Sequence, residues 1–110
     1  MQLKIIYKEK YIKKMITKIK SMIKGKTSYL DMIENGALVV DVRQPEEFAL
    51  GNILESVNIP LGLLPNRIYE MKGKNVVLVC ESGVRSMAAR NLLKKNGIDA
   101  HNAGSWKNLK

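Results

Sequence analysis

The sequence has few of the residues that build disulfide frameworks and metal sites. Cys80 is the only cysteine, which excludes a disulfide bond within the chain. His101 is the only histidine, so the usual zinc ligand sets of cysteine and histidine are excluded too. We therefore expect no metal and no other cofactor. A lone cysteine is either buried filler or a reactive thiol, and its neighbours in the sequence must decide between the two.

Long apolar runs are also missing. Lysines interrupt every apolar stretch of residues 1–26 before it reaches the roughly 7–15 residues of a secretory signal, and no small-residue cleavage site follows. Nowhere does the chain approach the roughly 20 apolar residues that a transmembrane helix needs. We therefore expect a cytoplasmic protein.

Positive charge is concentrated at the start of the chain. Residues 1–26 hold nine lysines and one acidic residue, a net charge of +8, whereas residues 27–110 contribute only +1 to the total of +9. A nucleic-acid-binding domain carries basic residues on its folded face, so we expect no nucleic-acid partner. The sequence divides into a basic leader over residues 1–26, helical or disordered, and one folded domain over residues 27–110.

Apolar residues recur at helical spacing along the leader, with lysines on the opposite face. They are Ile12, Met15, Ile16, Ile19, Met22 and Ile23. The pattern allows a basic amphipathic helix that binds an anionic membrane or partner, or a frayed or disordered extension. Because a segment rich in lysine and isoleucine produces such a stripe easily, we favour the extension and expect no membrane contact.

Beyond the leader, stretches with strand and helix patterns alternate. The expected strands are residues 37–40, 56–59, 76–79 and 98–102, and the expected helices are residues 29–34, a segment starting at Pro45, residues 61–71, residues 85–95 and a turn or short helix from residue 103. This alternation predicts a single-domain α/β fold with a central, mainly parallel sheet flanked by helices. Reactive groups of such sheets lie at the carboxyl ends of strands. The clearest strand runs directly into Cys80.

The segment that follows this strand has a composition suited to holding an anion. We expect a loop over residues 80–85 whose backbone N–H groups, with the next helix N-terminus, form a nest for a thiolate or persulfide anion. Gly83 permits the tight curvature because glycine adopts positive φ at little cost. Arg85 is placed at the rim to pair with an anionic donor. Such a nest should lower the pKa of the Cys80 thiol, which favours a reactive thiol over buried filler.

Three segments resemble the rhodanese homology domain. They are VVDVRQPEEFALGNILESVNIPL (residues 39–61), CESGVRS (residues 80–86) and NGIDAHNAGSW (residues 96–106). The resemblance implies a rhodanese-like fold and a sulfurtransferase whose catalytic residue, Cys80, cycles between a thiolate and a persulfide. The residues implied to cradle the substrate are Glu81, Ser82, Gly83, Val84, Arg85 and Ser86, the last serving equally well as a helix N-cap.

The resemblance also implies structural roles for three charged residues. Asp41 should lie at a strand end near the cysteine loop, and Arg43 should form an ion pair with Glu47. His101 is expected to be structural or exposed, because an activated thiolate attacks directly without a general base. Trp106 is expected to cover the small core.

The chain departs from the family pattern in the turn after Gly51. Asn52 stands where the family has a histidine, Leu54 where it has a glycine, and Ser56 where it has an alanine. We expect these differences to affect the packing of the turn rather than the sulfur chemistry.

Three functions are compatible with a thiolate in an anion nest. The first moves sulfane sulfur from a donor such as thiosulfate to a thiophilic acceptor, either cyanide or a thiol, and the second is a carrier that hands persulfide sulfur from a donor protein to an acceptor protein. The third is a cysteine phosphatase, but enzymes of that design have five residues between cysteine and arginine, and only four separate Cys80 from Arg85. The shorter loop suits a single sulfur atom, so we expect a thiosulfate sulfurtransferase.

Overall fold

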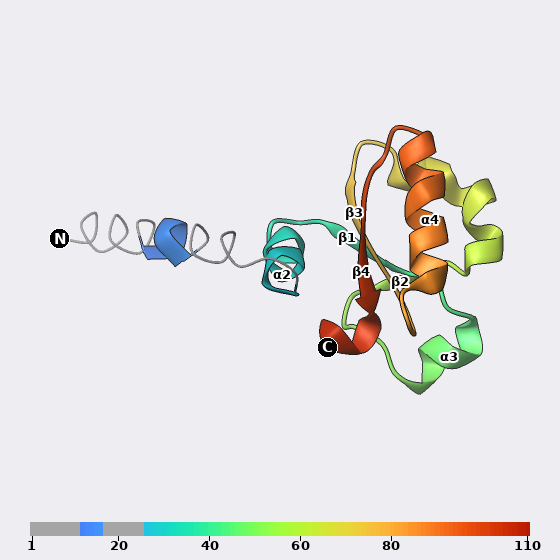
Figure 1. Ribbon diagram of the computed structural model, residues 1–110, viewed down its shortest axis with the longest axis horizontal. Helices are drawn as coiled ribbons and strands as arrows, with labels where there is room; N and C mark the ends of the chain where they lie inside the picture. The colour runs from blue at the N-terminus through green and yellow to red at the C-terminus, as the bar shows by residue number, and fades with distance from the viewer. Residues whose placement is uncertain (1–11, 17–25) are drawn as a thin grey trace.

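A four-stranded parallel sheet forms the centre of the protein (Figure 1). The computed structural model describes residues 12–16 and 26–110. Across the sheet the strands lie in the order β2-β1-β3-β4, and in chain order they are β1 (Leu38–Asp41), β2 (Val57–Asn58), β3 (Asn75–Cys80) and β4 (Asp99–Ser105). The predicted α/β fold with a central parallel sheet is confirmed.

Helices cover both faces of the sheet, with α4 and η1 on one side and α2 on the other (Figure 1). They are α2 (Lys26–Glu34), α3 (Pro45–Leu50), η1 (Leu61–Met71), α4 (Val84–Lys95) and η2 (Trp106–Asn108). The predicted segment at residues 61–71 is a 3₁₀ helix with Pro65 inside it. Proline lacks an N–H group and clashes with the preceding turn, which opposes a regular α-helix there.

Each face of the sheet has its own apolar cluster, because successive strand residues point to opposite sides. On the α4 side, Val40, Leu78 and Cys80 pack with Leu64 and Leu93. The cluster on the α2 side consists of Val39, Ile53, Val77, Val79, Trp106 and Leu109. The Cys80 side chain therefore points into the layer between the sheet and α4, and the expected core role of Trp106 is confirmed.

Strand β4 is longer than predicted. Leu78 pairs with Asn102, whereas the next residue of β3, Val79, pairs with Gly104, so Ala103 is an extra residue in β4. Pairing then continues to Ser105. The predicted turn or short helix is present as η2 but begins at Trp106 rather than at residue 103, because hydrogen bonding to β3 overrides the weak strand preference of the small residues before it.

The described residues of the leader are residues 12–16, which are helical, and Lys26, the first residue of α2. Ile12, Met15 and Ile16 are about half exposed there, at 54%, 48% and 46%. The rest of the predicted stripe, Ile19, Met22 and Ile23, lies outside the described residues. In the described ranges, no helix combines the length and the apolar character needed to cross a membrane.

The turn between α3 and β2 contains a residue in the left-handed region. Glu55 has φ of 66°, and it is the one non-glycine residue with positive φ in the described part of the chain. The backbone of this turn therefore favours glycine at Glu55 rather than at Leu54. Asn52 closes the turn, since its Nδ2 donates to the Phe48 carbonyl oxygen at 2.9 Å.

Glu55→Gly should raise the free energy of unfolding by about 0.5–1 kcal/mol, because glycine removes the steric cost of left-handed backbone but adds chain entropy to the unfolded state. Leu54→Gly is the matched control, since Leu54 is 87% exposed and has no positive φ. The control should lower stability by about 0.5–1 kcal/mol. Urea denaturation of both variants checks the assignment, and equal shifts of the same sign would contradict it.

Candidate functional site

The Cys80 sulfur lies in a nest of hydrogen-bond donors at the carboxyl end of β3. Sγ accepts hydrogen bonds from the backbone N–H of Gly83 at 2.9 Å and of Ser86 at 3.4 Å. The Ser86 hydroxyl oxygen lies 3.3 Å from Sγ. These donors come from the loop and the first turn of α4, so the predicted nest for an anionic sulfur is present.

The hydrogen bonds of the nest outweigh the effect of burial on the thiol. Burial alone raises the pKa of Cys80, because it penalises the charged thiolate. The Ser86 hydroxyl and the backbone N–H groups of Ser86, Gly83 and Ser82 lower it, and the net result is a pKa below the ordinary value for cysteine. The predicted direction of the shift agrees with this.

Gly83 turns the chain from the loop into the helix. It is the N-cap of α4 and has φ of 99°, so the left-handed conformation expected from the sequence is present. A Cβ atom at this position would lie 3.2 Å from the Gly104 Cα. The loop is shorter than predicted, since Cys80 belongs to β3 and α4 begins at Val84 rather than at residue 85. Arg85 thus lies in the first turn of the helix.

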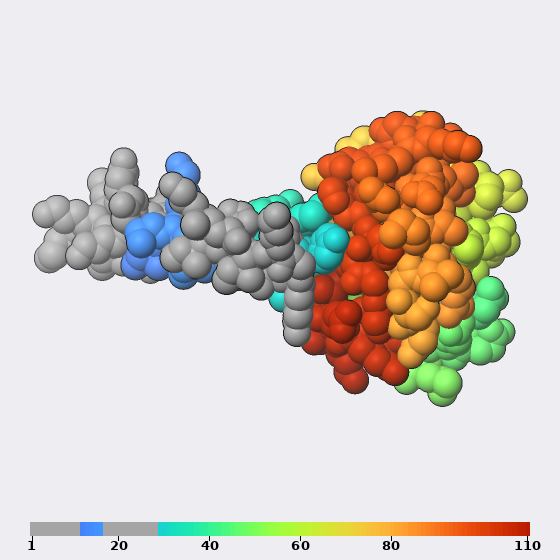
Figure 2. Space-filling view, in the orientation of Figure 1, coloured from blue at the N-terminus to red at the C-terminus, as the bar shows by residue number. Residues whose placement is uncertain are grey.

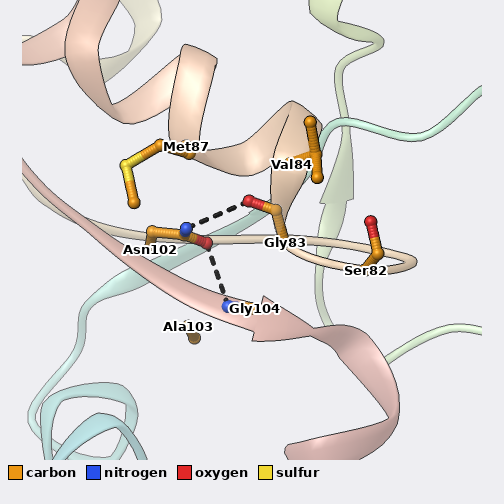
Figure 3. Close-up of a pocket in the computed structure, with 7 residues that line it drawn as sticks. All are labelled: Ser82, Gly83, Val84, Met87, Asn102, Ala103 and Gly104. Carbon is orange, nitrogen blue, oxygen red and sulfur yellow. Dashed lines mark hydrogen bonds between the residues drawn. The ribbon is translucent and has the colours of Figure 1, made fainter.

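Ser86 connects the thiol to β4. Its hydroxyl donates to the Asn102 Oδ1 at 2.6 Å. The Asn102 Nδ2 donates to the Gly83 carbonyl oxygen at 3.1 Å (Figure 3). The Asn102 Oδ1 also accepts from the Gly104 N–H at 3.0 Å. Ser86 is not an N-cap, because it is the third residue of α4. Asn102 was missed from the sequence, since its contact with the loop depends on the pairing of β4 with β3, which places it opposite Leu78.

Ser86→Ala should raise the pKa of Cys80, because the thiolate loses a hydroxyl that can turn its one hydrogen from the Asn102 Oδ1 to Sγ. Below this pKa the reaction rate follows the thiolate fraction, so the pH profile of iodoacetamide alkylation should move to higher pH. At any pH below the pKa of both proteins, alkylation should slow by about tenfold, which corresponds to the loss of one charge-assisted hydrogen bond. Ser82→Ala is the control, because it keeps the backbone N–H that supports the thiolate. A profile unchanged by Ser86→Ala would show that the backbone alone sets the pKa.

Arg43 forms the centre of a buried ion pair beneath the loop. Its Nη2 lies 2.7 Å from the Asp41 Oδ2, and the two side chains are 2% and 0% exposed. Arg43 also donates to the Gly51 carbonyl oxygen at 2.7 Å and lies 4.5 Å from the centre of the Trp106 ring. The predicted ion pair with Glu47 was wrong, because Arg43 contacts only the backbone oxygen of that residue, at 3.3 Å.

The Glu47 carboxylate binds Arg85 instead. Two hydrogen bonds of 2.6 and 2.9 Å join the carboxylate to the guanidinium, and they tie α3 to the first turn of α4. The hydrogen bonds from Arg85 and then from the Gln44 N–H lower the pKa of Glu47 to about 2. Arg85 is therefore at the predicted rim of the loop, but with a carboxylate of the chain as its partner.

Glu81 connects the loop to the end of the chain. Its carboxylate accepts from the Trp106 Nε1 at 3.0 Å and pairs with the Lys107 Nζ at 2.9 Å. The hydrogen bonds from Lys107 and Trp106 lower the pKa of Glu81.

His101 pairs with Asp99 at 2.9 Å near the surface. No group of three or more histidine, cysteine or acidic side chains within the described ranges could hold a metal ion.

A shallow hollow of about 550 Å³ lies beside the cysteine loop. Its lining comes from the loop, from α4 and from the bulge of β4, segments that meet on the face shown in Figure 2 (orange and red). The lining residues are all uncharged: Ser82, Gly83, Val84, Met87, Asn102, Ala103 and Gly104 (Figure 3). Val84 and Met87 are 75% and 43% exposed, so the hollow offers apolar surface next to the thiol loop.

Comparisons with known proteins agree with this geometry. Residues 26–110 match the Rhodanese-like domain family. A Bacillus subtilis relative, uncharacterized protein YqhL, is 47% identical over 62 residues, which cover 56% of this chain and 49% of that protein. A relative named sulfurtransferase from Allochromatium vinosum is 41% identical over 61 residues, or 54% of this chain and 57% of that protein. The chain thus spans about half the length of these curated relatives.

Similarity extends to solved structures. The crystal structure of a rhodanese-like domain protein from Staphylococcus aureus matches with a TM-score of 0.63 at 36% identity, and the match covers 67% of this chain and 74% of that one. The chain therefore shares its fold with that protein.

Proposed function

Since the chain belongs to the rhodanese-like domain family, we propose that it is a sulfurtransferase that carries sulfane sulfur as a persulfide on Cys80. The Cys80 thiolate attacks the outer sulfur of a donor such as thiosulfate, the S–S bond of the donor breaks, and sulfite leaves with the bonding electrons. The persulfide anion then gives its terminal sulfur to cyanide or to a thiol, and the Cys80 thiolate forms again. Relatives named sulfurtransferase support this reaction class.

The observation that carries the proposal is the position of Sγ among the N–H groups of Gly83 and Ser86. The same donors stabilise a thiolate before the first step and a persulfide anion after it, because both states place negative charge at this point. The N-terminus of α4 adds its positive partial charge. No general base is required, since the nest lowers the pKa of the thiol and so favours the thiolate that attacks.

Sulfur transfer requires access to a buried atom. Cys80 is 0% exposed in the described conformation, so a donor reaches Sγ only when the side chain rotates or when residues 81–83 shift. Glu81 and Ser82 are exposed, and a short exposed loop opens at low cost because few buried contacts are lost. A thiol of this kind must also stay reduced, which is consistent with a cytoplasmic location.

A coupled assay tests the proposal. The full chain is expected to produce thiocyanate from thiosulfate and cyanide, and to hydrolyse aryl phosphates negligibly, because four residues between Cys80 and Arg85 make a loop too small for a tetrahedral phosphate. Efficient phosphatase activity with no thiocyanate would contradict the proposal and indicate a cysteine phosphatase.

The second candidate is a persulfide carrier between two proteins, with weak activity on small donors. The uncharged hollow beside the loop favours it, because apolar surface suits a protein partner better than a small dianion. Persulfide loading from a donor protein without turnover of thiosulfate would support the carrier.

A further inference from the structure

The cations beside the cysteine loop are held by carboxylates of the chain itself. Arg43 pairs with Asp41, Lys107 pairs with Glu81, and Arg85 forms its bidentate pair with Glu47. Of these, Arg85 is the cation in the first turn of α4, one residue before the Ser86 N–H that bonds to Sγ. The negative charge of the Cys80 thiolate also stabilises its charged guanidinium.

Glu47 occupies the two donors that an oxyanion would use. The guanidinium fork matches a carboxylate, a sulfonate or a sulfate in the same bidentate geometry. Both Nη atoms of Arg85 are bonded to Glu47, at 2.6 and 2.9 Å, and the two side chains are only 34% and 36% exposed. A dianion approaching the loop therefore meets a neutral ion pair, and it can use these two Nη donors as a fork only by displacing the carboxylate.

We propose that Glu47 is a specificity-determining residue: by holding Arg85 at the rim of the loop, it weakens the binding of divalent oxyanion donors and favours a donor whose sulfane sulfur is carried on an organic thiol. This inference rests on the proposed sulfur transfer and names its donor class. The uncharged hollow next to the loop gives the organic part of such a donor an apolar surface to contact.

The transfer step balances without a further reactant. The Cys80 thiolate attacks the terminal sulfur of a persulfide R–S–SH, a new S–S bond forms to Cys80, and the original S–S bond breaks. The thiolate R–S⁻ leaves with the bonding electrons, and the transferred sulfur keeps its proton. The attacking thiolate and the leaving thiolate each carry one negative charge, so no dianion has to be stabilised at the rim.

Glu47→Gln tests the inference with little change of shape. The amide oxygen can still accept from the Gln44 N–H, which the Glu47 carboxylate binds at 3.1 Å at the start of α3. Glu46→Gln is the matched control, because it removes the same charge from the neighbouring, exposed residue. Thiosulfate kinetics and sulfate binding are measured for the wild type and both variants, with sulfate binding followed by the amide NMR shifts of Gly83 and Ser86 in the full chain.

In Glu47→Gln, the KM for thiosulfate and the Kd for sulfate should each fall by about fivefold, because the anion no longer competes with an exposed ion pair of ordinary strength. The kcat should change by less than about twofold. Turnover of an alkyl persulfide should change by less than about twofold in the same variant, and Glu46→Gln should match the wild type within about twofold throughout. A purely structural role for Glu47 would not separate KM from kcat in this way.

Sulfate binding tests the inference, and sulfur transfer tests the proposed function, so the two can fail separately. An unchanged or raised sulfate Kd in Glu47→Gln would overturn the inference, because Glu47 would then not compete for Arg85. A fivefold tighter sulfate Kd without any sulfur transfer, from thiosulfate or from the alkyl persulfide, would support the competition at Arg85 and overturn the proposed function.

Discussion

Cys80→Ser is expected to lower sulfur transfer by at least about 10³-fold, because the substitution removes the nucleophile and a serine hydroxyl is not ionised near neutral pH. The fold should survive. Serine has nearly the same shape, and its oxygen can accept from the Gly83 and Ser86 N–H groups that now bond to Sγ. The measurement is the thiosulfate-to-cyanide rate, together with the circular dichroism spectrum and melting curve of the variant.

Ser82→Ala provides the control for this experiment, since it changes an exposed loop side chain and keeps the thiol. Its rate should stay within about threefold of the wild type, because the substitution keeps the Ser82 backbone N–H and changes only an exposed side chain. A Cys80→Ser protein with near wild-type turnover would place the chemistry on another residue. If Cys80→Ser fails to fold, alkylation of Cys80 in the folded wild type tests the same claim, and it should remove the activity equally.

Arg43→Ala is expected to lower the free energy of unfolding by about 3–5 kcal/mol, because it leaves the Asp41 carboxylate buried without its counter-charge. Asp41 is 0% exposed and receives hydrogen bonds from the Arg43 Nε and Nη2 atoms, at 3.0 and 2.7 Å. The substitution also removes the donor to the Gly51 carbonyl oxygen. Urea denaturation monitored by Trp106 fluorescence measures the loss.

An exposed ion pair of the same chain gives the comparison. Arg67 and Glu70 lie three residues apart in η1, 2.6 Å from each other, with side chains 35% and 32% exposed. Arg67→Ala should cost no more than about 1 kcal/mol, as is usual for pairs screened by water. A loss for Arg43→Ala as small as that for Arg67→Ala would contradict a structural role of the buried pair.

The position of the thiol could be predicted from local sequence. An apolar run ending in Cys80 predicts a buried strand, and in a parallel sheet the residue that follows lies at the carboxyl edge, next to a helix N-terminus. The positive φ of Gly83 follows from the same segment, because the chain must reverse within a few residues. These features depend on residues that are neighbours in the sequence.

The partners of the charged residues could not be predicted in this way. Glu47 is four residues from Arg43 and 38 residues from Arg85, yet its carboxylate binds Arg85. That choice depends on how α3 lies against the first turn of α4, a tertiary arrangement that spacing does not report. The same holds for Asn102, whose contact with the loop depends on the pairing of β4 with β3.

The most direct measurement is the intact mass of the reduced chain after incubation with thiosulfate or with an alkyl persulfide, followed by desalting. We predict the mass of one added sulfur atom, its loss on addition of cyanide or of a reducing thiol, and no added mass in Cys80→Ser. A wild-type mass that stays unchanged with both donors would contradict a persulfide on Cys80.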